Sequence, residues 1–481
     1  MVGEKLFSIL SSLSPEEFKR LRKVFKSPFF TTNERHLILY EFLKKFYPDF
    51  NSSNLNKEEI FKLLYPDRPF NDGVLRVMIR EFSQVTEEYM LLIVLRKNGV
   101  ERKKLLTSIY NDRNLYPLFA KETEKLVKEL KKNDTLNFNH HQDIYELNFA
   151  YFFHPATVKL SQDDAPLLEM MEGLDKLYIL NKFRICSEML NRSRIFAKSY
   201  DIRLLKELQE LTQKDFVPDN ILLQLFLLVL KLHEALVPED EIIFDELKTV
   251  FLENYQDLHR LDQSLLLTQM INFVVRKINT GKSGYFEDGL KLYKIALDAG
   301  LVLEQNNIDE GVYSNIVNLG CQANEFEWVH DFMLAYKTNL KEAVQDDIFE
   351  LNKGIYFFYQ KDFDNAQQQF MNHGYSPRFQ MNARLNLTKT LFEQYLQDES
   401  YYDVFNAQIA SFRKYLSRTV GKKDYKFKSI INFLAVVQGL MQDIYENKNK
   451  QIVIENANNQ LVKNPIMASK PWILEKLGDM K

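Results

Sequence analysis

The chain contains little glycine and proline. Gly and Pro number 15 and 13, or 28 of 481 residues, a share of about 6% that is half the usual value. Both residues break helices and mark tight turns, so their scarcity favours long helices with short connections. It argues against a β-sandwich or β-barrel, because those folds need many tight turns.

Cysteine and long hydrophobic runs are also scarce. Cys186 and Cys321 are the two cysteines, and neither has a neighbour at metal or redox spacing, so we expect buried thiols without a disulfide. The most apolar stretch, 221–230, is interrupted by Gln224 and is shorter than the roughly 20 residues that span a bilayer. The N-terminal apolar run is too short for a signal peptide. We therefore expect a cytoplasmic protein.

The formal net charge of -3 is unevenly distributed. Residues 1–135 contain 25 Lys/Arg and 19 Asp/Glu, a balance of +6, which leaves -9 for the rest of the chain. This mild dipole is weak grounds for an anionic partner at the N-terminal end, since uneven solvated faces also explain it.

Helix-start and helix-stop signals are frequent in the N-terminal part. Ser14-Pro15-Glu16-Glu17 combines an N-cap, a proline in the first turn and a capping box, Asn56 offers a further cap, and a long helix is expected to begin near Asn71. Residues 1–100 are therefore predicted to form a helical module. Residues 101–481 are predicted to form a second region, an array of helical repeats with a C-terminal capping helix. Apolar spacing predicts helices at about 15–26, 34–46, 71–97, 101–110, 115–131 and 142–153.

A helix–turn–helix pattern stands out in residues 347–370. Gly354 and Phe357 precede a turn, and Ala366 and Phe370 follow it on one helical face, as expected where a small residue lets two helices approach. Related units begin near Phe286, Phe326 and Tyr402, and together with the turn at Phe363 they follow one another at intervals of 37 to 40 residues. In the second unit Val317 stands where the small residue is expected. The sequence thus predicts an all-α fold of helical-hairpin repeats, an α-solenoid.

Residues 283–420 resemble a degenerate tetratricopeptide array through these small and aromatic positions. The N-terminal module and the segment 470–477 are also similar to bacterial helical-repeat proteins of unknown function. The resemblance implies that the first helix of each pair lines a concave groove, and we expect the final helix around Trp472 to cover the last repeat as a cap. The groove residues that the resemblance implies are Ser314, Asn318, Gln322, Leu351, Ile355 and Tyr359.

Motifs that would carry catalysis are incomplete. Thr280-Gly281-Lys282-Ser283 is similar to part of a phosphate loop, but Arg276 occupies the place of the first glycine, so an inter-helix turn is expected. His140, His141, Asp143 and His154 have generic spacing, without a histidine pair four residues apart. Carboxylate pairs lie at expected helix starts, where negative charge complements the helix dipole. We expect no metal, no cofactor and no catalytic residues.

A basic cluster lies on the polar side of the first predicted capped helix. Such a face can contact nucleic-acid phosphates, anionic lipids or an acidic protein, although a solvated helix face is the default interpretation. The cluster comprises Lys19, Arg20, Arg22, Lys23 and Lys26.

These observations favour a non-catalytic scaffold or adaptor that binds a peptide or protein in a repeat groove. A nucleic-acid-binding or regulatory protein that uses the basic helix is the first alternative. An enzyme whose site is assembled from distant helices is the second. The partner, the pathway and the oligomeric state stay open at this stage.

Overall fold

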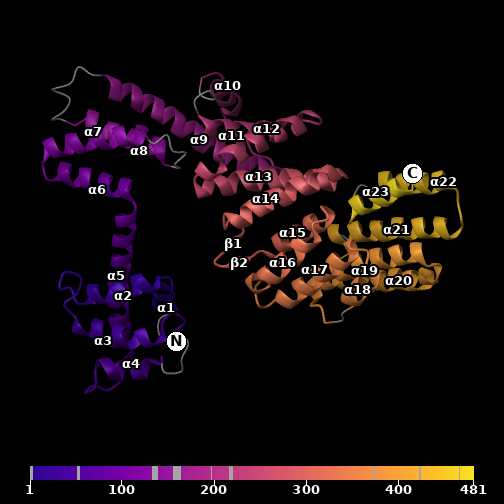
Figure 1. Ribbon diagram of the computed structural model, residues 1–481, viewed down its shortest axis with the longest axis horizontal. Coiled ribbons are helices and arrows are strands. Elements are labelled where there is room, and N and C mark those ends of the chain that lie inside the picture. Colours follow the sequence, from indigo (N-terminus) through magenta and orange to yellow (C-terminus); the bar gives the residue numbers. More distant parts are fainter. Residues whose placement is uncertain are drawn as a thin grey trace. The chain divides into compact units, whose positions relative to one another are not determined.

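The computed structural model describes residues 4–50, 55–132, 139–154, 164–196, 198–215, 220–371, 374–421, 424–464 and 466–480. The chain divides into two compact units, each described by itself. Unit 1 comprises residues 1–134 and 141–174, and unit 2 comprises residues 135–140 and 175–481. The described residues are overwhelmingly helical (Figure 1). The prediction of an all-α fold is therefore confirmed.

Unit 1 is built from helices whose ends agree closely with the predicted ones. Helix α2 begins with the predicted capping box, in which the Glu17 amide donates to Ser14 Oγ at 3.3 Å and the Ser14 amide donates to Glu17 Oε2 at 3.0 Å. The elements are α1 (Glu4–Ser11), α2 (Pro15–Phe25), α3 (Glu34–Leu43), the 3₁₀ turn η1 (Lys44–Phe46), α4 (Lys57–Leu64), α5 (Asp72–Lys97), α6 (Gly99–Asp112), α7 (Tyr116–Lys132), α8 (His140–Phe152) and the start of α9 (Ala165–Phe196).

Helices α1 to α5 share one hydrophobic core. Phe25 stacks on Phe82 with ring centroids 4.3 Å apart, and Tyr40 donates from its hydroxyl to the Phe18 carbonyl at 3.1 Å. A smaller cluster around Leu126 and Leu147 joins α7 and α8. The compact unit includes residues up to 174, and the boundary that the sequence predicted near residue 100 lies within it. That position is the junction of α5 and α6, where the first core ends.

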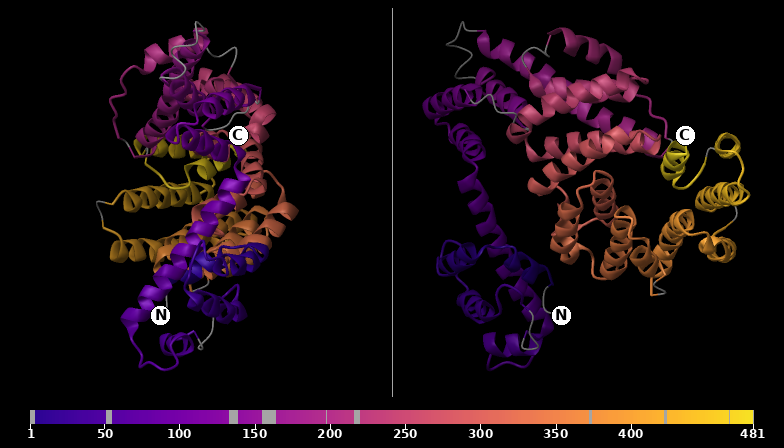
Figure 2. Two further views of the ribbon diagram at one scale, coloured as in Figure 1. Left: turned by 90° about the vertical axis from the view of Figure 1, so that its left-hand side faces the viewer. Right: turned by 45° about the vertical axis from the view of Figure 1, so that its right-hand side comes forward.

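Unit 2 continues as a succession of helices, which Figures 1 and 2 show following one another along the chain. A short antiparallel hairpin, which the sequence did not predict, joins α14 and α15 and pairs Leu303 with Ile308. The elements after α9 are α10 (Leu205–Asp215), α11 (Ile221–Glu234), α12 (Glu239–Asn254), η3 (Tyr255–Asp257), α13 (Arg260–Asn279), η4 (Ser283–Tyr285), α14 (Phe286–Asp298), β1 (Leu303–Glu304), β2 (Asn307–Ile308), α15 (Glu310–Gln322), α16 (Phe326–Tyr336), η5 (Lys337–Asn339), α17 (Gln345–Tyr359), α18 (Phe363–Phe370), α19 (Pro377–Gln397), η6 (Glu399–Tyr401), α20 (Tyr402–Thr419), α21 (Tyr425–Tyr445), α22 (Lys450–Lys463) and α23 (Lys470–Asp479).

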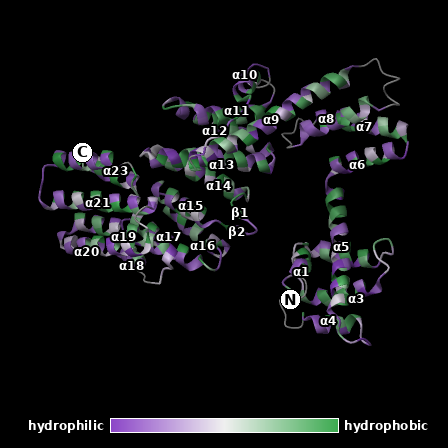
Figure 3. Ribbon diagram, turned by 180° about the vertical axis from the view of Figure 1, so that it is seen from behind, coloured by the Kyte–Doolittle hydropathy of each residue, from purple (hydrophilic) through white to green (hydrophobic). Residues whose placement is uncertain are grey.

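Most helices of unit 2 are amphipathic, and Figure 3 shows hydrophilic and hydrophobic residues along the same helices. Helix α11 differs because its residues from Leu222 to Leu230, except Gln224, are buried. It is therefore the buried helix that its apolar sequence predicts. None of the helices within the described ranges combines the length and the hydropathy needed to cross a bilayer.

The same turn ends α13, α15, α17 and α21, whereas α19 ends at Asp398 in an extended conformation. Gly281, Asn324, Lys361 and Asn447 adopt left-handed backbone conformations, with φ of 92°, 59°, 64° and 54°. The amide of each donates a hydrogen bond to the carbonyl three residues earlier. The amide of the next residue donates to the carbonyl five residues before it. This is the Schellman arrangement, in which a left-handed residue satisfies the last carbonyls of a helix.

Close helix approaches recur at three glycines of unit 2. A β-carbon on Gly289 would lie 2.9 Å from Val274 Cγ1, and one on Gly320 would lie 2.3 Å from Val329 Cγ2. The sequence placed the small residue of the second unit at the position of Val317. That assignment is wrong by one helical turn, because Gly320 is the residue on which the next helix packs.

Helix α23, which the sequence predicted as a cap on the last repeat, packs against several earlier helices of unit 2. Trp472 packs against Phe392 of α19 and Phe433 of α21, with ring centroids 5.5 Å and 6.1 Å apart. On another face of α23, Leu474 packs against Gly281, the residue that follows α13. A β-carbon added at Gly281 would lie 3.1 Å from Leu474 Cδ1. Helix α23 therefore reaches from α19 and α21 to α13. Its apolar face, which includes the buried Ile473, is covered by these helices.

Candidate functional site

A cavity of about 1110 Å³ lies inside unit 2, and we call it the inner cavity. Its walls come from α15, α17, α19, α23, the start of α21 and the turn after α13. Cavities of roughly 300–1,000 Å³ hold small ligands, so this one can accept a drug-sized molecule or a few residues of a peptide. Aromatic side chains on its wall are Phe286, Phe358, Tyr359, Phe363, Tyr425 and Trp472.

Three of the six groove residues implied by the sequence line the inner cavity: Asn318 and Gln322 on α15 and Tyr359 on α17. Ser314 lies outside its lining, where its hydroxyl accepts a hydrogen bond from the Asn352 amide at 3.0 Å.

Leu351 and Ile355 do not line an exposed groove. Their exposed fractions are 3% and 7%, and both belong to the hydrophobic core of the array. They lie four residues apart on the face of α17 that packs inward. Tyr359 continues the same stripe, but at the end of the helix, where it borders the cavity.

Lys389 on α19 is the most unusual charged residue of the inner cavity. Its ammonium lies 3.4 Å from Asn386 Oδ1, and no carboxylate of the described residues lies within 4.0 Å. Protein atoms surround the ammonium although part of the side chain is accessible. Loss of hydration lowers the pKa of Lys389 to about 8, and the negative charge of Glu475 opposes the shift.

The neighbouring carboxylate on α19 is satisfied within the protein. Glu393 accepts hydrogen bonds from Trp472 Nε1 at 3.2 Å and forms an ion pair with Lys476 Nζ at 3.0 Å. Both charged side chains are largely buried, with exposed fractions of 12% and 15%. Glu475, on the same helix as Lys476, has a raised pKa because burial removes part of its hydration.

The inner cavity therefore carries an excess of positive charge. Its lysines are Lys361, Lys389, Lys470 and Lys476, and its carboxylates are Glu393 and Glu475. Four cations against two anions leave a formal charge of +2. Together with the aromatic wall, this charge suits a ligand that is partly apolar and carries an anionic group.

Sequence reasoning missed Lys389 and the whole contribution of α23. Lys389 lies between helical core positions and resembles any solvated lysine. Glu393 lies 79 residues before Trp472 and 83 before Lys476, and a single sequence carries no signal that joins residues so far apart.

A second cavity of about 1300 Å³ lies beside the β-hairpin, between α13, α15 and the loop before α17. Its arginine, Arg378, is already paired with Glu310, which lines the same cavity. With Lys341, Glu304 and Asp309 also in its lining, two cations face three carboxylates, so this cavity is the weaker candidate for an anionic ligand.

The basic cluster, which comprises four residues of α2 and its C-cap residue Lys26, is exposed on the surface of unit 1. Arg20 is paired with Glu16 at 3.5 Å, and Arg22 is paired with Glu41. The other three, Lys19, Lys23 and Lys26, form no ion pair with a described residue. The hydrogen bond from Arg22, with the charges of Lys44 and Lys26, holds the pKa of Glu41 below its ordinary value.

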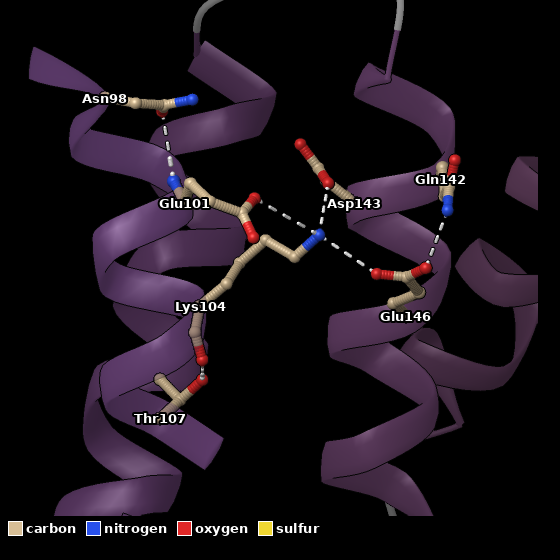
Figure 4. A network of polar contacts seen from close by, with 7 residues as sticks. All are labelled: Asn98, Glu101, Lys104, Thr107, Gln142, Asp143 and Glu146. Atoms are coloured by element: carbon tan, nitrogen blue, oxygen red, sulfur yellow. Dashed lines mark hydrogen bonds and ion pairs between the residues drawn. The ribbon is translucent and has the colours of Figure 1, made fainter. Parts of the chain in front are cut away.

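The histidine-containing segment of unit 1 forms polar contacts of an ordinary kind. His154 Nε2 lies 2.8 Å from Asn111 Oδ1, and Asp143 forms an ion pair with Lys104 at 2.6 Å. Figure 4 shows Lys104 directed between Asp143 and Glu146, which neutralise it. Within the described ranges, no group of three or more His, Cys, Asp or Glu is placed to hold a metal ion.

The segment similar to a phosphate loop ends a helix. Thr280 caps α13, and Gly281 closes it in the left-handed turn described above. Lys282 is paired with Glu241 of α12. The segment is the inter-helix turn that the sequence predicted, without a preceding strand.

Both cysteines are buried and free. Burial raises the pKa of Cys186 and raises the pKa of Cys321 to about 12. Comparison of the chain with protein-family models, with curated proteins and with solved structures found no match.

Proposed function

We propose that α13–α22 form a curved array of helical hairpins of the tetratricopeptide type. The support is the recurrence of one left-handed turn after α13, α15, α17 and α21. Close approaches at Gly289, Gly320 and Gly354 are further support, because small residues at such places are typical of stacked helix pairs.

We infer that the protein is a non-catalytic scaffold or adaptor that binds a peptide or protein segment in the inner cavity. The observation that carries this proposal is that Asn318, Gln322 and Tyr359 share one cavity with the aromatic and charged side chains of α19 and α23. Amide groups can pair with a peptide backbone, and aromatic rings supply apolar contact area.

The test uses the double variant Asn318→Ala/Tyr359→Phe in quantitative affinity capture from native cells, with the captured proteins identified by mass spectrometry. The main partner is then titrated as a purified protein. We expect binding to weaken about tenfold, as for loss of central interface contacts, while helicity measured by circular dichroism is unchanged. The matched control is Asn456→Ala/Tyr445→Phe, at exposed positions outside the cavity. Equal partner binding by both double variants would remove the proposal.

A second candidate function is binding of a nucleic acid by α2. The observation that favours it is the exposure of all five basic residues, three of them without an ion pair. Reversal of Lys19, Lys23 and Lys26 to Glu should abolish salt-sensitive binding of DNA or RNA oligonucleotides, because each phosphate contact releases counterions. No shift of the wild-type protein at low salt in a fluorescence-anisotropy titration would exclude this function.

A further inference from the structure

We propose that the inner cavity recognises a phosphate monoester group on the bound partner segment, with Lys389 as the central ligand and Lys361 and Lys470 as further cations. This proposal rests on the proposed function and adds the chemical class of the partner. Three observations carry it: the isolation of Lys389, the charge of the cavity, and the backbone at Lys361.

Lys389 is an ammonium group without a counter-ion inside a cavity. Its polar contact is the 3.4 Å approach to Asn386 Oδ1, and the ion pair at the same wall joins Glu393 to Lys476 instead. A charge taken out of water is costly unless it is paired. The pKa of Lys389, lowered to about 8, reflects this cost. An anion bound in the cavity would supply the missing partner.

The charge of the inner cavity matches a dianion better than a monoanion. Lys476 is neutralised by Glu393 and also pairs with the exposed Asp479 at 3.2 Å, a residue outside the lining of the cavity. The three remaining lysines face one remaining carboxylate, Glu475, which leaves a formal +2. A phosphate monoester carries about -1.5 to -2 at pH 7 and offers three acceptor oxygens, whereas a single carboxylate would leave one positive charge uncompensated.

Lys361 occupies a backbone position that disfavours a lysine. Gly281, Asn324 and Asn447 occupy the same left-handed turn after other helices, and glycine and asparagine tolerate this conformation best. Lys361 adopts φ 64° and lines the inner cavity. Strained backbone often coincides with function. At Lys361 the functional feature is its long cationic side chain, which asparagine or glycine would not supply.

The experiment is a calorimetric titration of the full-length protein with inorganic phosphate, with a nonapeptide that contains phosphoserine, and with the same peptide unphosphorylated. A peptide with glutamate in place of phosphoserine tests a carboxylate. We expect the phosphopeptide to bind at least tenfold more tightly than either other peptide. Equal binding of the glutamate peptide would overturn the proposal, and so would binding that does not depend on the phosphate.

Two variants separate a ligand role from a structural one. Lys389→Met and Lys361→Asn should each weaken phosphopeptide binding, the first about tenfold, and both should raise the melting temperature because they remove an unpaired buried charge and a strained residue. Lys414→Met, at an exposed position of α20 outside the cavity, is the matched control and should change neither. A lower melting temperature for Lys389→Met would show that the protein itself compensates the ammonium, which overturns the proposal.

The outcomes are distinguishable from those of the proposed function. If phosphate is not recognised while Asn318→Ala/Tyr359→Phe still loses its partner, the cavity binds a partner but not a phosphate. If that double variant keeps its partner while Lys389→Met loses phosphopeptide binding, the phosphate site stands without the proposed partner groove.

Discussion

Gly354 of α17 lies directly against the ring of Phe370 on α18. A β-carbon at Gly354 would fall 2.5 Å from Cε1 and 2.9 Å from Cδ1 of that ring. Phe370 is buried, with an exposed fraction of 3%, and Ala366 beside it is fully buried. The two helices thus approach more closely than any residue larger than glycine allows, which explains the pattern of small and aromatic residues in this stretch.

The substitution Gly354→Ala should therefore destabilise the protein although alanine favours helices. Overpacking of a core typically costs about 1–3 kcal/mol, while the change from glycine to alanine in a helix contributes roughly 0.5–1 kcal/mol of stability. We expect a net loss of about 1–2 kcal/mol in the free energy of unfolding in urea. The matched control is Gly439→Ala in α21, where a β-carbon meets nothing within 4 Å, and it should stabilise. Equal stability of the two variants would contradict the packing argument.

Loss of Trp472 should show whether α23 is an integral part of unit 2. Its exposed fraction is 7%, and its indole contacts Phe392, Phe433 and Glu393. Trp472→Ala should cost about 3–5 kcal/mol of unfolding free energy. Trp472→Phe, which loses mainly the hydrogen bond to Glu393, should cost less. Val462→Ala on α22, where the side chain is 80% exposed, should have no measurable effect. A melting curve unchanged by Trp472→Ala would show that α23 is dispensable.

Local signals in the sequence predicted the helices well. Side chains such as those of Ser14 and Asn71 accept hydrogen bonds from amides three residues later. All residues that define such a helix start therefore lie within a short stretch of sequence. The same holds for the turn after α13, where Arg276 and Gly281 indicated a helix end. The all-α fold follows from such signals added along the chain.

Long-range packing could not be predicted in the same way. The resemblance to tetratricopeptide arrays implied that Leu351 and Ile355 line a groove, but which face of α17 is buried depends on α15, α18 and α19. Helix α23 was expected as a cap because it is the last helix of the chain. Its amphipathic pattern predicts a buried face but does not indicate which helices cover that face. Lys389 becomes notable only once its lack of a carboxylate partner is known, and that depends on residues from several helices.

A buried ion pair joins α9 to α13 in unit 2. Arg184 donates from Nε and Nη2 to the two oxygens of Asp262 at 2.7 Å and 2.6 Å, and the two side chains have exposed fractions of 5% and 0%. Asp262→Ala leaves a buried guanidinium without its counter-ion, so we expect a loss of about 3–5 kcal/mol in urea unfolding. The double variant Arg184→Met/Asp262→Leu should recover most of that loss because it buries no charge. A double variant less stable than Asp262→Ala would contradict this account.

His233 should make the stability of unit 2 sensitive to acid. Its ring lies 2.8 Å from Gln269 Oε1 through Nε2, and its exposed fraction is 7%. Burial lowers the pKa of His233 from 6.5 to about 4, so the unfolded chain binds a proton between these pH values that the folded chain does not. The stability that neutral His233 contributes is therefore complete above about pH 6.5 and is lost as the pH falls towards 4.

The measurement compares urea unfolding of the wild type and of His233→Gln at pH 7.5 and pH 5. Glutamine can still donate to Gln269 but does not titrate. The shift in pKa corresponds to about 3 kcal/mol when the window is crossed completely, and to roughly 2 kcal/mol at pH 5. We expect the wild type to lose that much more than the variant between the two pH values, since His36 and the carboxylates contribute equally to both. An equal loss in the two proteins would mean that His233 is hydrated in the folded state.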